Sequence, residues 1–250
     1  MLNSVSPARA APPSSRRSRQ HGLSLVELLV GATIGLFVMG AAVLGITTSL
    51  RENRLLLLEA RLQQDLRAAM DLITRDTRHA GYWGSAVRGV PTATSSATAN
   101  PHIAIDLSTM PDRPNRVDST TPVSATGNAA SLITYRWDRN ANGDLDANEA
   151  YQFRLDSNKI QMQIGSGGWQ DVTDPGSMVV TSFSITPRVT WLPLYDKCTT
   201  TCNPVSQNCP ELAIRTLTFQ LSARSLDSSV QRTLRSDVRV RNDALQGSCS

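Results

Sequence analysis

The sequence predicts an α+β protein, in which one long N-terminal helix is followed by a domain built mainly from antiparallel strands. Three observations support this fold class. A stretch of 23 residues near the N-terminus carries no charge, an amphipathic repeat continues it without a break, and segments of alternating apolar and polar residues follow from residue 132 onward. The first 50 residues differ so much in composition from the rest that we treat the two parts separately.

Residues 1–22 form a basic leader. They contain Arg9, Arg16, Arg17 and Arg19 and no acidic residue, so that removing them would lower the formal net charge of the chain from +4 to 0. Binding to nucleic acid phosphates requires a basic surface that stays in the mature protein. The net charge therefore gives no support to a nucleic-acid-binding protein.

The uncharged stretch, residues 28–50, is long enough to cross a bilayer, since a helix of this length would span about 34 Å. Basic residues precede it and none follows before Arg51, which predicts a cytoplasmic leader and an external C-terminal part. The alternative is a secretory signal peptide that is cleaved near Ala42. The apolar stretch continues well beyond that position, which favours a membrane helix that is retained.

After Arg51 the pattern becomes amphipathic, and apolar residues recur at every third or fourth position. These residues are Leu55, Leu58, Leu62, Leu66, Ala69 and Ile73. We therefore expect one helix from about residue 25 to about residue 79 that ends near Gly81 and turns an apolar stripe toward the following domain. The predicted organisation is a leader (1–22), a transmembrane half of the helix (23–50), an amphipathic half (51–80) and a β-rich head domain (81–250).

Residues 21–30, HGLSLVELLV, resemble the class III signal of type IV pilins and type II secretion pseudopilins. This sequence has leucine where the family usually has phenylalanine. The resemblance implies a pilin fold, cleavage after Gly22 by a prepilin peptidase and methylation of the new N-terminus at Leu23. Glu27 would then be the fifth mature residue and would pair with the N-terminal amine of a neighbouring subunit, which sets register more than it adds stability.

Residues 75–84, RDTRHAGYWG, resemble the segment that closes the first helix in PilW-type minor pilins. The resemblance implies a single-pass inner-membrane protein with a periplasmic head, which enters the filament and is a candidate for its tip. Implied partners are other minor pilins, the major pilin, the assembly platform, a tip adhesin and membrane lipid. A type II secretion pseudopilin of the J type is the nearest alternative, and neighbouring genes would discriminate between the two.

Alternating segments predict six strands in the head domain. They are residues 132–137, 150–155, 160–164, 178–189, 213–223 and 230–240. The last two resemble the closing hairpin of the PilW and pseudopilin J families. Residues 85–130 are rich in Ser, Thr, Ala, Pro and Asn and predict loops, with one strand at most near residues 102–107.

Between the first two predicted strands, residues 138–149 match the twelve-residue calcium-loop pattern D-x-[DN]-x-[DN]-G-x5-E at every specified position. The expected ligands are side-chain oxygens of Asp138, Asn140 and Asn142, the carbonyl of Asp144, a direct or water-bridged contact from Asp146 and two oxygens of Glu149. The predicted strands on both sides place this loop at the tip of a hairpin. The pattern itself predicts that the loop binds Ca2+ with a structural role. The alternative is a polar turn without a metal.

The chain has four cysteines, Cys198, Cys202, Cys209 and Cys249, all beyond the predicted membrane helix. An exported domain meets an oxidising compartment, which predicts two disulfides, and three pairings are possible. The alternative is a zinc site, but the spacing lacks the paired C-x2-C elements that such sites favour.

An enzyme is not expected, because His21, His79 and His102 belong to no recognisable metal or nucleophile motif, and such isolated histidines are usually surface or capping residues. A DNA-binding pilin is the alternative from another class. It would use the C-terminal arginines, Arg215, Arg224, Arg232, Arg235, Arg239 and Arg241. Acidic residues are interleaved with these arginines, which favours a solvated strand face over a surface that binds nucleic acid.

Overall fold

The computed structural model describes Gly22 and residues 24–90, 98–107, 123–126, 132–199, 202–203, 209–241 and 243–247. The chain divides into two compact units, Met1–Glu52 and Asn53–Ser250. Helix α1, Leu25–Thr77, contributes to both and is 53 residues long. The single long helix predicted from the sequence is therefore confirmed, with an end two residues earlier than expected.

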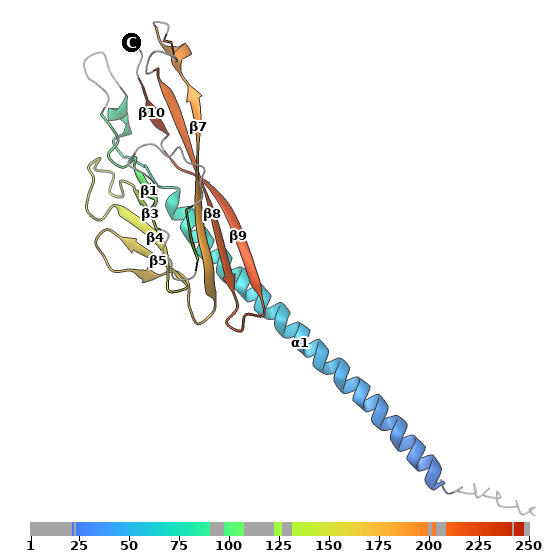
Figure 1. Ribbon diagram of the computed structural model, residues 1–250. Coiled ribbons are helices and arrows are strands. Elements are labelled where there is room, and N and C mark those ends of the chain that lie inside the picture. Colours follow the sequence, from blue (N-terminus) through green and yellow to red (C-terminus); the bar gives the residue numbers. More distant parts are fainter. Residues whose placement is uncertain are drawn as a thin grey trace, which may run out of the picture. The chain divides into compact units, whose positions relative to one another are not determined.

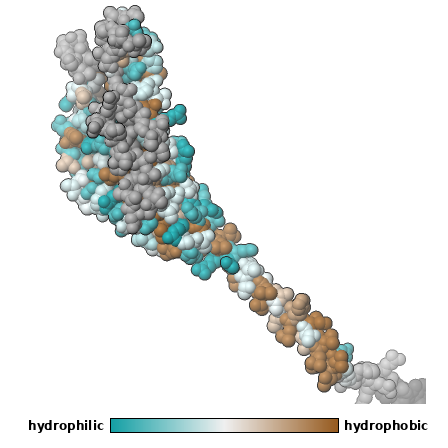
Figure 2. Space-filling view, viewed as in Figure 1, coloured by the Kyte–Doolittle hydropathy of each residue, from teal (hydrophilic) through white to brown (hydrophobic). Residues whose placement is uncertain are grey.

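In the N-terminal unit, every described residue of α1 is exposed, and most of them are apolar. Figure 2 shows the brown, hydrophobic surface of this part of the helix on the face in view. The threonine hydroxyl groups of this part bond to the helix itself, since Thr33 Oγ1 donates to Val30 O and Thr47 and Thr48 Oγ1 each donate to Leu44 O, all at 2.9 Å. Among the described residues, α1 is the one helix whose length and composition suit a membrane span.

In the second unit, α1 buries one stripe. Its apolar members are Leu62, Leu66, Ala69, Met70 and Ile73. Leu55 is still 36% exposed, so burial of the predicted stripe begins only at the position where the helix meets the strands. The helix ends at Thr77, and a turn leads to Gly81, whose positive φ of 78° is a conformation that glycine adopts without strain.

The head contains two antiparallel sheets (Figure 1). The first has the order β1-β3-β4-β5-β6, with β1 Ile105–Leu107, β3 Leu132–Arg136, β4 Ala150–Asp156, β5 Lys159–Ile164 and β6 Gln170–Asp171. The second has the order β10-β8-β7-β2, with β9 also paired to β8. Its strands are β2 Val123–Thr126, β7 Val179–Pro193, β8 Glu211–Arg224, β9 Gln231–Arg239 and β10 Ala244–Gln246.

All six predicted strands are present, as β3, β4, β5, β7, β8 and β9. The sequence missed β2, β6 and β10, which have two to four residues each and are too short to show an alternating pattern. Two short 3-10 helices, η1 Ala86–Gly89 and η2 Tyr195–Lys197, complete the described elements.

A single apolar core joins the second half of α1 to both sheets. Phe153 of β4 and Ile73 of α1 are fully buried, and Phe183 of β7 stacks on Phe219 of β8 with ring centroids 6.2 Å apart. This arrangement confirms the α+β class with a helix packed on antiparallel sheets.

Candidate functional site

The predicted processing site lies directly before α1. Gly22 is exposed, Glu27 is exposed in the first helical turn, and Leu23 lies outside the described residues. A carboxylate is favourable at a helix N-terminus, because the partial positive charge of the helix dipole is located there. Glu27 is also the last charged residue before the uncharged stretch begins.

The predicted calcium loop, residues 138–149, connects β3 to β4, which pair antiparallel and end at the facing residues Arg136 and Ala150. One further backbone bond, from Trp137 N to the Glu149 carbonyl at 3.3 Å, extends the ladder to the base of the loop. The two terminal acids of the motif, Asp138 and Glu149, are thereby brought to the same end of the hairpin.

Asp138 is fully buried. Its Oδ2 accepts hydrogen bonds from the backbone N–H groups of Gly84 and Gly143, both at 2.9 Å. Its Oδ1 is also buried, and within the described part of the chain this atom has no hydrogen-bond partner. Because a buried carboxylate oxygen without a partner is costly, this atom is a candidate ligand for a cation.

The middle of the loop brings three predicted ligands together. Asn140 Nδ2 and Asn142 Nδ2 both donate to Asp146 Oδ2, at 2.8 and 3.0 Å. Asn140 Oδ1 accepts from Asn142 N at 3.0 Å, and Asn142 Oδ1 accepts from Asp144 N at 2.8 Å. Gly143 has a φ of 87°, which explains the glycine at this position of the motif.

Glu149 is buried and has three contacts. Its Oε1 accepts from Arg139 N at 2.9 Å, and its Oε2 accepts from Asp146 N at 3.1 Å. His102 Nε2 lies 2.9 Å from Glu149 Oε2, and the histidine side chain is 0% exposed. The expectation that His102 is a surface or capping residue is therefore wrong. No local pattern could reveal this contact, since the two residues are 47 positions apart.

The chemistry of the donor set fits Ca2+, which prefers six to eight oxygen ligands. Asp138 Oδ1, which is buried and has no hydrogen-bond partner, is an oxygen that such an ion could bind. In the described part of the chain, no group of three or more His, Cys, Asp or Glu side chains is gathered in a way that could hold a metal ion. Calcium binding stays a prediction for this loop, whose pattern also relies on asparagine and backbone oxygens.

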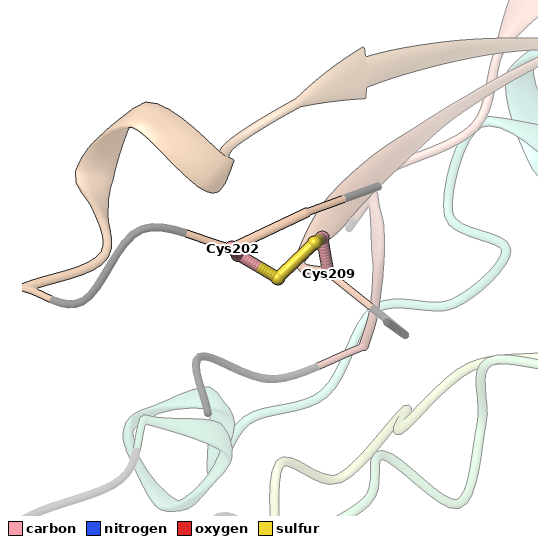
Figure 3. Close-up of a disulfide and its surroundings, with 2 residues drawn as sticks. All are labelled: Cys202 and Cys209. Atoms are coloured by element: carbon pink, nitrogen blue, oxygen red, sulfur yellow. A yellow bond between two sulfur atoms is a disulfide. The ribbon is translucent and has the colours of Figure 1, made fainter. Parts of the chain in front are cut away.

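Figure 3 shows the disulfide between Cys202 and Cys209, which are seven positions apart and both buried, in the connection from β7 to β8. Cys198 is also disulfide-bonded, and no described cysteine is free. Cys249 lies outside the described residues. Because the sulfurs of Cys202 and Cys209 are bonded to each other, the four-cysteine zinc site is ruled out.

The C-terminal arginines do not all lie on a solvated face. Arg215 is 2% exposed, its Nη1 donates to the Ile103 carbonyl at 2.5 Å, and burial lowers its pKa to about 10. Placing Arg215 on the exposed face was wrong, although strand alternation groups it with the buried Leu217 and Phe219 and could have identified it. Arg232 pairs with Glu59 of α1.

Two family models match the chain. The model described as prepilin peptidase-dependent protein B matches residues 55–240, which include the second half of α1 and most of both sheets. The model described as a prokaryotic N-terminal methylation motif matches residues 17–43, which include Gly22 and Glu27. No curated protein and no solved structure matches the sequence.

Proposed function

This chain belongs to the prepilin peptidase-dependent protein B family, and we propose that it is a minor pilin of the PilW type. The family and the methylation motif together identify a pilin-like protein that is processed by prepilin peptidase. In the proposed function, the mature subunit joins other minor pilins at the inner membrane and helps to prime assembly of a type IV pilus. The PilW assignment is supported by the resemblance of residues 75–84 and of the β8–β9 hairpin.

The observation that supports this function best is the exposed Glu27, five positions after Gly22 on a helix that carries no further charge before Arg51. An ionised residue within the apolar layer costs about 3 kcal/mol on translocon scales, so a carboxylate at its edge needs a compensating charge. Cleavage after Gly22 would create a cationic amine at Leu23. Glu27 of one subunit would pair with this amine of its neighbour as the helices assemble.

Substitution of Glu27 tests the proposal. We expect Glu27→Ala to be cleaved normally but to be lost from sheared filaments, as measured by mass spectrometry of the membrane fraction and by immunoblotting of the filaments. Glu52→Ala is the matched control, because it removes an exposed acid from the same helix beyond the apolar stretch and should enter filaments normally. Normal incorporation of Glu27→Ala would contradict the proposal.

A type II secretion pseudopilin of the J type is the second candidate, supported by the resemblance of the β8–β9 hairpin. The two candidates share processing and fold, so deletion of the gene separates them. Loss of surface pili with normal protein secretion is expected for the minor pilin, and the opposite phenotype for the pseudopilin.

We propose further that residues 138–149 bind Ca2+ with a structural role. The main support is the buried Asp138 Oδ1, together with a motif that matches at every specified position. A dissociation constant of about 10^-4 to 10^-3 M would suit an extracellular domain. Ca2+ would compensate the charge of Asp138, and the side chains of Asn140, Asn142, Asp146 and Glu149 would complete the ligand set.

Calcium titration of the detergent-solubilised full chain tests this site. We expect Ca2+ to raise the melting temperature of the wild type and of Asn148→Ala, which changes an exposed residue of the same loop at a position that the motif leaves unspecified. Asn140→Ala and Asp138→Ala should lose most of this response. Equal responses to a chelator in all four proteins would exclude the site.

A further inference from the structure

The calcium loop packs against the segment that ends α1. We call residues 81–85 the helix-closing segment. Asp138 N donates to the Tyr82 carbonyl at 2.9 Å, Gly84 N donates to Asp138 Oδ2 at 2.9 Å, and Trp83 Nε1 donates to the Gly143 carbonyl at 2.8 Å. These bonds join the end of the helix to a loop more than 50 residues later in the chain.

The two segments also fit tightly, and two glycines allow it. A Cβ atom on Gly84 would lie 2.8 Å from Ala141 Cα, and a Cβ atom on Gly143 would lie 2.2 Å from Ser85 Oγ. Both distances are far below normal van der Waals contact. Trp83 is only 4% exposed, so this junction is closed to solvent at its centre. The helix-closing segment and the loop can therefore pack this closely only because both contact positions are glycine.

Both terminal acids of the loop connect to the helix-closing segment. Asp138 does so directly, because the same carboxylate that has the unpartnered Oδ1 uses its Oδ2 to hold Gly84 N. Glu149 does so through two residues, since His102 lies against Glu149 Oε2, His102 N donates to Asn100 Oδ1 at 2.8 Å, and Asn100 Nδ2 donates to the Gly81 carbonyl at 2.8 Å. The predicted first and last metal ligands are thus both fixed by contacts that reach residues 81–84.

From these contacts we propose that Ca2+ binding is coupled to docking of the helix-closing segment, so that the ion fastens the end of α1 to the β3–β4 hairpin. This inference rests on the proposed calcium site. Docking places the Asp138 and Glu149 carboxylates, and the ion in turn stabilises the arrangement in which they hold the segment. Coupling of this kind is reciprocal, so weakening the docking must also weaken Ca2+ binding. The wider consequence is that the helix-closing segment is fastened more firmly to the β3–β4 hairpin when external calcium is plentiful.

Hydrogen exchange of the detergent-solubilised full chain, followed by mass spectrometry of its peptides, tests the coupling. We expect Ca2+ to slow exchange at least tenfold in peptides that contain residues 81–85 as well as in those that contain residues 138–149. Exchange in the turn between β8 and β9 should not change.

Two variants that alter no predicted ligand sharpen the test. Gly84→Ala should weaken Ca2+ binding about tenfold and abolish the protection of residues 81–85, because its methyl group meets the Ala141 backbone. Asn100→Ala, which cuts the second connection, should weaken binding to a smaller extent. Gly89→Ala is the matched control, since a Cβ atom there has its nearest contact at an ordinary 3.5 Å from Trp83 and should leave affinity and exchange unchanged.

The outcomes distinguish the inference from the site on which it rests. Absence of Ca2+ binding to the wild type would overturn both. If Ca2+ binds and protects residues 138–149 while exchange of residues 81–85 stays the same, the site stands and the coupling is overturned. The wild-type comparison decides this even if Gly84→Ala fails to fold.

Discussion

The two compact units of this chain differ in the exposure of the apolar side chains of α1. In the N-terminal unit, Leu36 and Phe37 of α1 are 71% and 80% exposed, whereas Leu66 and Ile73 of the same helix are 1% and 0% exposed in the second unit. The buried residues of the second unit pack against the chain's own sheets. The exposed residues of the first unit belong to a segment whose length and composition suit a membrane span. One helix thus combines an exposed apolar segment with a segment that is buried in the core of the second unit.

The largest expected effect separates the two halves of α1. Leu66→Ala should lower the free energy of unfolding of the head by about 2 to 5 kcal/mol, because it leaves a cavity among fully buried side chains. Leu36→Ala, on the exposed half, should leave it unchanged. Chemical denaturation of the detergent-solubilised chain, followed by the strand signal in circular dichroism, measures both. Equal effects of the two substitutions would remove the distinction between the halves.

Removal of the disulfide tests whether a change that destabilises the head leaves the N-terminal unit unaffected. Replacing Cys202 and Cys209 by serine should lower the free energy of unfolding of the head by about 2 kcal/mol, since a short loop is no longer closed in the unfolded chain. The helical signal of the N-terminal unit should not change. Since Cys202 and Cys209 pair with each other, non-reducing peptide mapping of the wild type should recover these two cysteines joined by a disulfide.

The smallest expected effect concerns a contact between α1 and β3. The Tyr135 hydroxyl donates to Asp76, and burial together with this carboxylate raises the pKa of Tyr135 well above its usual value. Burial also raises the pKa of Asp76. Removal of the hydroxyl in Tyr135→Phe should cost about 1 kcal/mol at neutral pH.

The raised pKa of Tyr135 also predicts how the stability of the head changes with pH. Above about pH 10 the tyrosine loses its proton in the unfolded chain but keeps it in the folded one, so stability falls as the pH rises further. Tyr135→Phe should flatten that decline, and Tyr195→Phe, at an exposed tyrosine of η2, should retain it. A melting curve taken at each pH checks this, and an unchanged slope in Tyr135→Phe would show that Tyr135 is not the group responsible.

Periodicity in the sequence was sufficient to predict the helix, six strands and the position of the 138–149 loop, because each depends on local spacing. It was not sufficient for the contacts that surround the loop. Asp138 is held by Gly84, 54 positions earlier, and Glu149 is held by His102, 47 positions earlier, and both contacts depend on how the strands bring distant segments together. The burial of Arg215 could have been predicted, since the alternating pattern of β8 places it on the buried face. It was missed because a charged residue is expected on the exposed face.

The most direct test of the account is mass spectrometry of the mature N-terminus of the protein purified from its native membrane. We expect a chain that begins at Leu23 with a methylated amine, which is the group that Glu27 is proposed to meet in the next subunit. A chain that retains its arginine-rich leader, or one cut near Ala42, would contradict it.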